Sequence, residues 1–170
     1  MVVYMAASLK PGIFSGVILI CLFGACLTNP AFAERDLPRF VSIGADKAYA
    51  RSGPSRQYPV LWVYQRRGLT VEIVNEYEYW RKVRDIDGQG GWMHQSLLTA
   101  KRTAIINAAG TVFLKNSPAD DAQIIAGLEP RVVVDLLKCQ KNWCRVKKAD
   151  FYGWVERNFL WGIYPGEQIN

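Results

Sequence analysis

The sequence predicts an all-β protein that consists of two tandem small barrels. Apolar and polar residues alternate over short stretches such as 71–74, and turn-forming segments such as 52–55 and 85–91 separate these stretches. The second half of the chain repeats the first, and after the N-terminal region no segment has a sustained helical period. Units of about 60 residues that contain only short strands and turns are typical of small closed barrels.

The N-terminal region predicts a secretory signal peptide over residues 1–33. An apolar run of 15 residues at 13–27 follows the basic residue Lys10, and Ala31-Phe32-Ala33 after it is typical of a cleavage site. A membrane-spanning helix needs about 20 apolar residues. We therefore expect cleavage, with no stable membrane span in the mature chain. Two alternatives stay open, namely lipidation at Cys26 and a translation start at Met5.

Cleavage after Ala33 would leave 137 residues, 34–170, with 20 basic and 15 acidic side chains. Such a mild basic excess is compatible with phosphate-bearing surfaces or nucleic acid. However, Lys and Arg occur in no run longer than a pair. The charges therefore indicate a solvated surface, and export argues against a nucleic-acid partner.

An internal repeat divides the mature chain into two units. Segments match at offsets of 64, 63 and 62 residues: 47–54 with 111–118, 80–83 with 143–146, and 91–93 with 153–155. The two one-residue shifts fall in predicted turns, so we expect domains at 34–100 and 101–170. The strand period predicts that four residues of the repeat point into the cores: Val83, Trp92, Val146 and Trp154.

Cys139 and Cys144 are the two cysteines of the mature chain, and they flank a polar turn between two expected strands. Opposed residues of an antiparallel pair have Cα atoms about 4.5 Å apart, which suits a disulfide. An even cysteine count in an exported chain also favours a bridge. The spacing differs from the Cys-x-x-Cys of thiol oxidoreductases, and zinc would need further ligands. We therefore predict a Cys139–Cys144 disulfide and no metal site.

The motifs of the first unit resemble those of the bacterial SH3-like domain family. They are Ala50-Arg51-x-Gly53-Pro54-Ser55, Gly68 before Val71 and Ile73, Trp80 with Val83, Gly91-Trp92-Met93, and Leu97. The second unit is similar but degenerate, with Lys115 in place of the Arg and Ser117 in place of the Gly. The resemblance implies two SH3-like barrels in an exported adaptor of the cell envelope, periplasmic or extracellular. It implies peptidoglycan or an envelope protein as the partner.

Catalysis is not expected. His94 is the only histidine, which excludes sites that need two, and neither a nucleophile elbow nor a phosphate-binding loop occurs. Asp85 and Asp87 lie in a Gly-rich segment, where turn formation explains them. We therefore predict a non-enzymatic protein without a cofactor.

Aromatic residues of the first unit supply the candidate binding site. Aromatic grooves recognise extended peptides and sugars through flat contacts at low entropic cost. The candidate ligand-binding residues are Arg51, Arg56, Tyr58, Trp62, Tyr64, Tyr77 and Tyr79. The alternative is a structural or assembly protein, in which these aromatic residues form an interface between domains or subunits.

Overall fold

The computed structural model describes residues 36–170, which belong to one compact unit. The predicted signal peptide, Cys26 and Met5 lie outside the described residues. Within residues 36–170, no helix has the length and apolar character that a membrane crossing requires.

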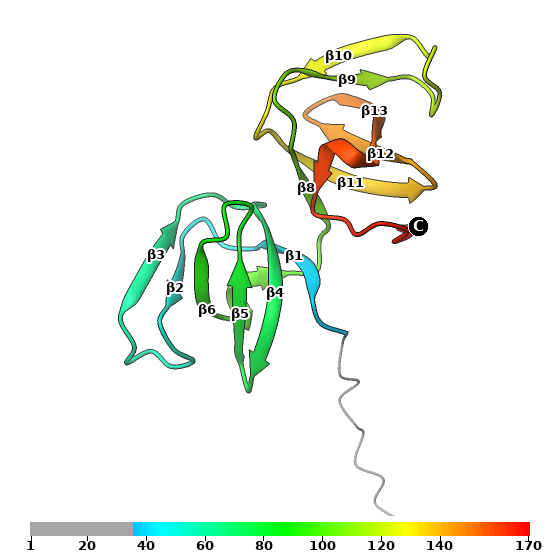
Figure 1. Ribbon diagram of the computed structural model, residues 1–170. Helices are drawn as coiled ribbons and strands as arrows, with labels where there is room; N and C mark the ends of the chain where they lie inside the picture. Colours follow the sequence, from blue (N-terminus) through cyan, green and yellow to red (C-terminus); the bar gives the residue numbers. More distant parts are fainter. Residues whose placement is uncertain (1–35) are drawn as a thin grey trace, which may run out of the picture. The chain divides into compact units, whose positions relative to one another are not determined.

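The first seven strands form one sheet, in the spatial order β3-β2-β6-β5-β4-β1-β7 (Figure 1). These strands are β1 (Arg39–Ile43), β2 (Ala48–Arg51), β3 (Val60–Tyr64), β4 (Thr70–Tyr77), β5 (Trp80–Arg84), β6 (Gly90–His94) and β7 (Leu98–Thr99). A single 3-10 turn, η1 (Gln95–Leu97), connects the last two. We call this sheet with its core the first barrel.

The next seven strands form a second sheet, in the order β10-β9-β13-β12-β11-β8-β14. These are β8 (Thr103–Ile106), β9 (Val112–Lys115), β10 (Ile124–Leu128), β11 (Val133–Gln140), β12 (Trp143–Lys148), β13 (Phe151–Glu156) and β14 (Leu160–Trp161), with the 3-10 turn η2 (Arg157–Phe159) before β14. Adding seven to each strand number of the first sheet gives this order. The predicted all-β fold with two tandem copies of one unit is therefore confirmed, and we call the second copy the second barrel.

Each barrel has its own hydrophobic core, built from alternate residues of its strands. Small side chains of β2, Ala48 and Ala50, are fully buried, and so are β-branched residues of the longer strands such as Val71 and Val146. The alternation expected for strands buried on one face is clear in β2, β9, β12 and β13. Burial of such side chains, at about 25 cal/mol per Å² of apolar surface, is the main stabilising term in each barrel.

The predicted inward position of the two tryptophans is wrong, although Val83 and Val146 are buried as expected. Trp92 and Trp154 are only half-buried, because the neighbouring glycines occupy the inward positions of β6 and β13. A Cβ atom on Gly91 would lie 2.5 Å from the Arg51 carbonyl oxygen. Side chains alternate along a strand, so Met93 and not Trp92 enters the core.

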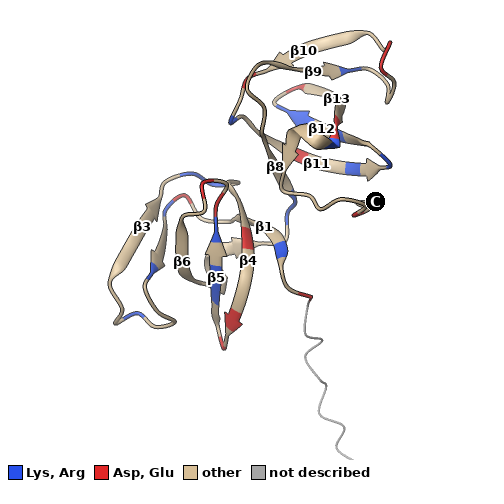
Figure 2. Ribbon diagram, in the orientation of Figure 1, with Lys and Arg blue, Asp and Glu red and all other residues tan. Residues whose placement is uncertain are grey.

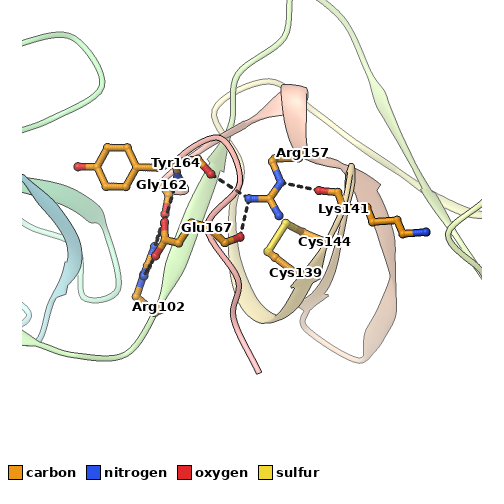
Figure 3. The surroundings of a disulfide bond; sticks show 8 residues. All are labelled: Arg102, Cys139, Lys141, Cys144, Arg157, Gly162, Tyr164 and Glu167. Carbon is orange, nitrogen blue, oxygen red and sulfur yellow. Dashed lines mark hydrogen bonds and ion pairs between the residues drawn. A yellow bond between two sulfur atoms is a disulfide. The ribbon is translucent and has the colours of Figure 1, made fainter.

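The predicted disulfide is present in the second barrel. Cys139 and Cys144 are directly paired in the β11–β12 hairpin, with their Cα atoms 4.1 Å apart and their sulfur atoms bonded (Figure 3). Both residues are buried in the core of this barrel. The backbone of Cys139 also pairs with Ile169, so the bridged hairpin holds the C-terminal segment as well.

Two arginines fix the same C-terminal segment. The Arg157 guanidinium donates to the carbonyl oxygens of Lys141, Tyr164 and Glu167, at 2.7–3.0 Å. The Arg102 guanidinium forms an ion pair with the Glu167 carboxylate (Figure 3). Burial by itself raises the pKa of Glu167. The hydrogen bonds that its carboxylate accepts from Arg102 and from the Tyr164 amide, together with the positive charges of Arg102 and Arg157, outweigh burial and lower this pKa below its ordinary value.

Candidate functional site

The β2–β3 hairpin of the first barrel exposes apolar side chains on both of its sides. β3 is an end strand of the sheet, and Val60, Leu61, Trp62 and Val63 are all 41–54% exposed. Tyr49 on β2 pairs with Val63 across the hairpin and is exposed beside it. Figure 2 shows no charged residue on β3, in contrast to β5. An exposed strand of this kind is a common docking surface.

The loop that joins β2 to β3 is held in shape by Arg51. The Arg51 guanidinium donates to the Tyr58 carbonyl oxygen at 2.7 Å, and the Ser52 amide donates to the Pro59 carbonyl oxygen at 3.0 Å. A Cβ atom on Gly53 would lie 2.7 Å from the Tyr58 ring, so glycine allows this ring to cover the loop. Arg51 thus positions the half-exposed Tyr58 ring.

Three candidate residues of this hairpin, Arg56, Tyr58 and Trp62, are exposed. The sequence analysis missed Tyr49, Leu61 and Val63, which are exposed on the same hairpin. The sequence did contain a signal for Tyr49. Its neighbours Ala48 and Ala50 are small enough to point into a crowded core, and alternation along the strand then turns Tyr49 outward. We call these exposed side chains, which lie on both sides of the hairpin, the hairpin face; they are Tyr49, Tyr58, Leu61, Trp62 and Val63.

Tyr64 belongs to the core and not to this face. The residue is 9% exposed, and its hydroxyl donates to the Asp85 carboxylate at 3.0 Å. Burial, together with the charge and the hydrogen bond of Asp85, raises the pKa of Tyr64 well above its ordinary value. The other Asp85 oxygen accepts the backbone amides of Asp87 and Gln89, so this carboxylate serves the turn, as expected.

Tyr77 and Tyr79 lie apart from the hairpin in sequence and in strand order. They occupy the β4–β5 turn, where both are more than half exposed. The Tyr79 ring lies 6.3 Å from the His94 ring, and within residues 36–170 no ring contact joins this turn to the hairpin face. The structure therefore divides the candidates into two separate groups.

His94 has a structural role in the first barrel. Its Nδ1 atom accepts a hydrogen bond from the Ser96 backbone amide at 3.3 Å and so caps the η1 turn. The His94 and Trp80 rings pack edge to face, with their centroids 5.5 Å apart. Among the described residues, no cluster of His, Cys, Asp or Glu is arranged to hold a metal ion.

Comparison of the sequence with models of known protein families assigns one and the same domain type to both halves of the chain. The sequence model of the bacterial SH3 domain matches residues 44–99 and 108–162, together more than half of the chain. The protein belongs to the bacterial SH3 domain family. The two matched segments lie within the two barrels, and bacterial SH3 domains are binding domains.

Two of the solved structures that match this chain carry the NlpC designation in their names. NlpC2 from Trichomonas vaginalis is 13% identical over 73% of this chain and 48% of its own, with a TM-score of 0.34. An NlpC/P60 family protein from Bacillus cereus is 14% identical over 77% of this chain and 58% of its own, with a TM-score of 0.31. This bacterial SH3 protein thus spans about half the length of these structures, and no curated protein matches it.

Proposed function

We propose that this protein is an exported, non-catalytic binding module of the cell envelope. Its first barrel would recognise peptidoglycan or an envelope protein through the hairpin face. Membership of a family of binding domains supports the general role. The observation that carries the specific proposal is the uncharged, exposed β3 strand with aromatic rings on and beside it.

The chemistry of the hairpin face suits wall material. Peptidoglycan combines sugar rings with short peptides, and aromatic side chains bind both through large flat contacts at little cost in side-chain entropy. Trp62 lies in the middle of β3, on the other side of the hairpin from Tyr49 and Val63, while Arg51 fixes Tyr58 at the loop end. A rigid aromatic surface of this type needs little reorganisation on binding.

The Cys139–Cys144 bridge supports export, because disulfides persist in oxidising compartments. A non-catalytic role agrees with the position of His94, which is engaged by the η1 turn and by Trp80. Asp85 is likewise committed to Tyr64 and to its own turn.

Co-sedimentation with isolated peptidoglycan sacculi tests the proposal. The protein lacking the predicted signal peptide, residues 34–170, should be retained, and Trp62→Ala should weaken retention about tenfold, as loss of an aromatic anchor does. Phe151→Ala is the matched control, since Phe151 is an exposed aromatic residue of the second barrel. Equal retention of the two variants, with both folded by circular dichroism, would contradict the proposal.

Self-assembly through β3 is the second candidate function. β3 is an end strand with a free edge in its sheet, and strand edges without charges favour pairing with another strand. Because Val60–Tyr64 carries no charge, two copies would meet without electrostatic repulsion. Light scattering should then give a dimer that Leu61→Lys dissociates. A monomer at all concentrations would exclude this function.

A further inference from the structure

The second barrel contains a pocket of its own. Its cavity measures about 370 Å³, within the range of about 300–1,000 Å³ that small-ligand sites occupy. Aromatic walls come from Phe113 on β9, Trp143 on β12 and Phe159 in η2, and two charged residues, Lys115 and Glu156, also line it. An apolar cavity with a few convergent polar groups is the usual form of a ligand site.

Among the described residues, the Glu156 side chain forms no hydrogen bond, in contrast to the corresponding residue of the first barrel, His94. Both residues precede a 3-10 turn and pair with a tryptophan across the sheet, Glu156 with Trp143 and His94 with Trp80. His94 caps its turn, whereas the Glu156 side chain makes no capping bond. In the part of the chain that the structure describes, no ion pair or hydrogen bond engages the Glu156 carboxylate.

Lys115 brings the opposite charge to the same pocket. Its ammonium lies 5.2 Å from the centroid of the Trp143 ring and donates to the Asp120 carbonyl oxygen at 2.7 Å. These contacts fix the position of the ammonium but do not neutralise it. Among residues 36–170, no ion pair joins Lys115 to Glu156, so the pocket presents a fixed cation and an available carboxylate.

We infer that this pocket binds a zwitterionic ligand, either a free amino acid or a short peptide with unblocked ends. An ammonium group would pair with Glu156, a carboxylate with Lys115, and an aliphatic body would contact Trp143, Phe113 and Phe159. A ligand with charge of one sign would meet repulsion from one of the two side chains. The inference concerns the second barrel and does not rest on the function proposed for the hairpin face.

Titration with unblocked alanyl-leucine, followed by ¹H–¹⁵N NMR, tests this site. The indole signal of Trp143, assigned with Trp143→Phe, should shift on addition of the dipeptide to the 34–170 protein. Glu156→Gln should weaken binding by about fivefold or more, the loss expected for one ion pair of about 1 kcal/mol. His94→Gln, the matched change in the first barrel, should leave the affinity unchanged.

Blocked N-acetyl-alanyl-leucine amide, which lacks both charges, should bind at least about tenfold more weakly than the unblocked dipeptide. Equal affinity for the two dipeptides, or equal affinity of Glu156→Gln and wild type, would overturn the inference. Absence of any shift at millimolar dipeptide would overturn it as well. Trp62→Ala should retain dipeptide binding, which separates this site from the hairpin face.

Discussion

Replacement of Tyr64 by Phe tests whether this residue serves the core or a binding surface. The substitution removes only the hydroxyl that donates to the Asp85 carboxylate at 3.0 Å, because the phenyl ring fills the same space. A hydrogen bond to a charged acceptor contributes about 1.5–3 kcal/mol. Asp85 is only half-buried, so water can partly replace the lost donor, and we expect a decrease of about 1.5 kcal/mol in the free energy of unfolding.

Urea unfolding of the 34–170 protein measures this change. Tyr77→Phe is the matched control, since Tyr77 is 54% exposed on the β4–β5 turn, and it should alter the free energy of unfolding by less than about 0.5 kcal/mol. Retention of Tyr64→Phe by sacculi should equal that of wild type. A stability loss no larger than that of the control, or a loss of retention without a loss of stability, would refute the placement of Tyr64 in the core.

Three further predictions concern stability. Gly91→Ala should lower the free energy of unfolding, measured in urea, by about 3 kcal/mol or more, because its Cβ atom would lie 2.5 Å from a backbone oxygen. Gly68→Ala should lower it by only about 1 kcal/mol, because Gly68 has a φ of 82° but open space around it. Joint replacement of Cys139 and Cys144 by Ala should cost about 2 kcal/mol, because the bridge closes a short loop, and reduction of wild type should give a similar loss. The lowered pKa of Glu167 means that its carboxylate stabilises the fold above its ordinary pKa of 4.5 and loses this effect as the pH falls. The stability difference between wild type and Glu167→Gln, measured across a pH series, should therefore be largest near neutrality and disappear in acid.

The sequence predicted the repeated fold well because its signals are local and occur twice. Turn formers mark the strand ends, and the segments that match in the repeat become corresponding strands of two sheets with the same order. The outward position of Trp92 was not predictable from strand period alone. The close approach of Gly91 to the Arg51 carbonyl oxygen decides which residues of β6 face the core, and this approach is a property of the folded sheet.

The candidate site was predicted only in part. The run Tyr58–Tyr64 contains no charged residue, so no alternation distinguishes its inward side chains from its outward ones. Pairing with Ala48 directs Tyr64 inward, and the irregular register between Ala50 and Arg51 changes the alternation along the hairpin. Both facts depend on the partner strand, and they explain why Tyr64 was included and Leu61 was missed.

The two barrels share one fold but present different chemistry, and the difference arises from substitutions at corresponding positions of the repeat. In the first barrel, the residue paired with Trp80 is His94, which caps the η1 turn. In the second barrel, the residue paired with Trp143 is Glu156, which lines the pocket. The loop cation is Arg51 in one and Lys115 in the other, and only Lys115 lies over a tryptophan ring. Since fold alone does not determine function, these substitutions favour separate ligands for the two barrels over repeated binding of one ligand.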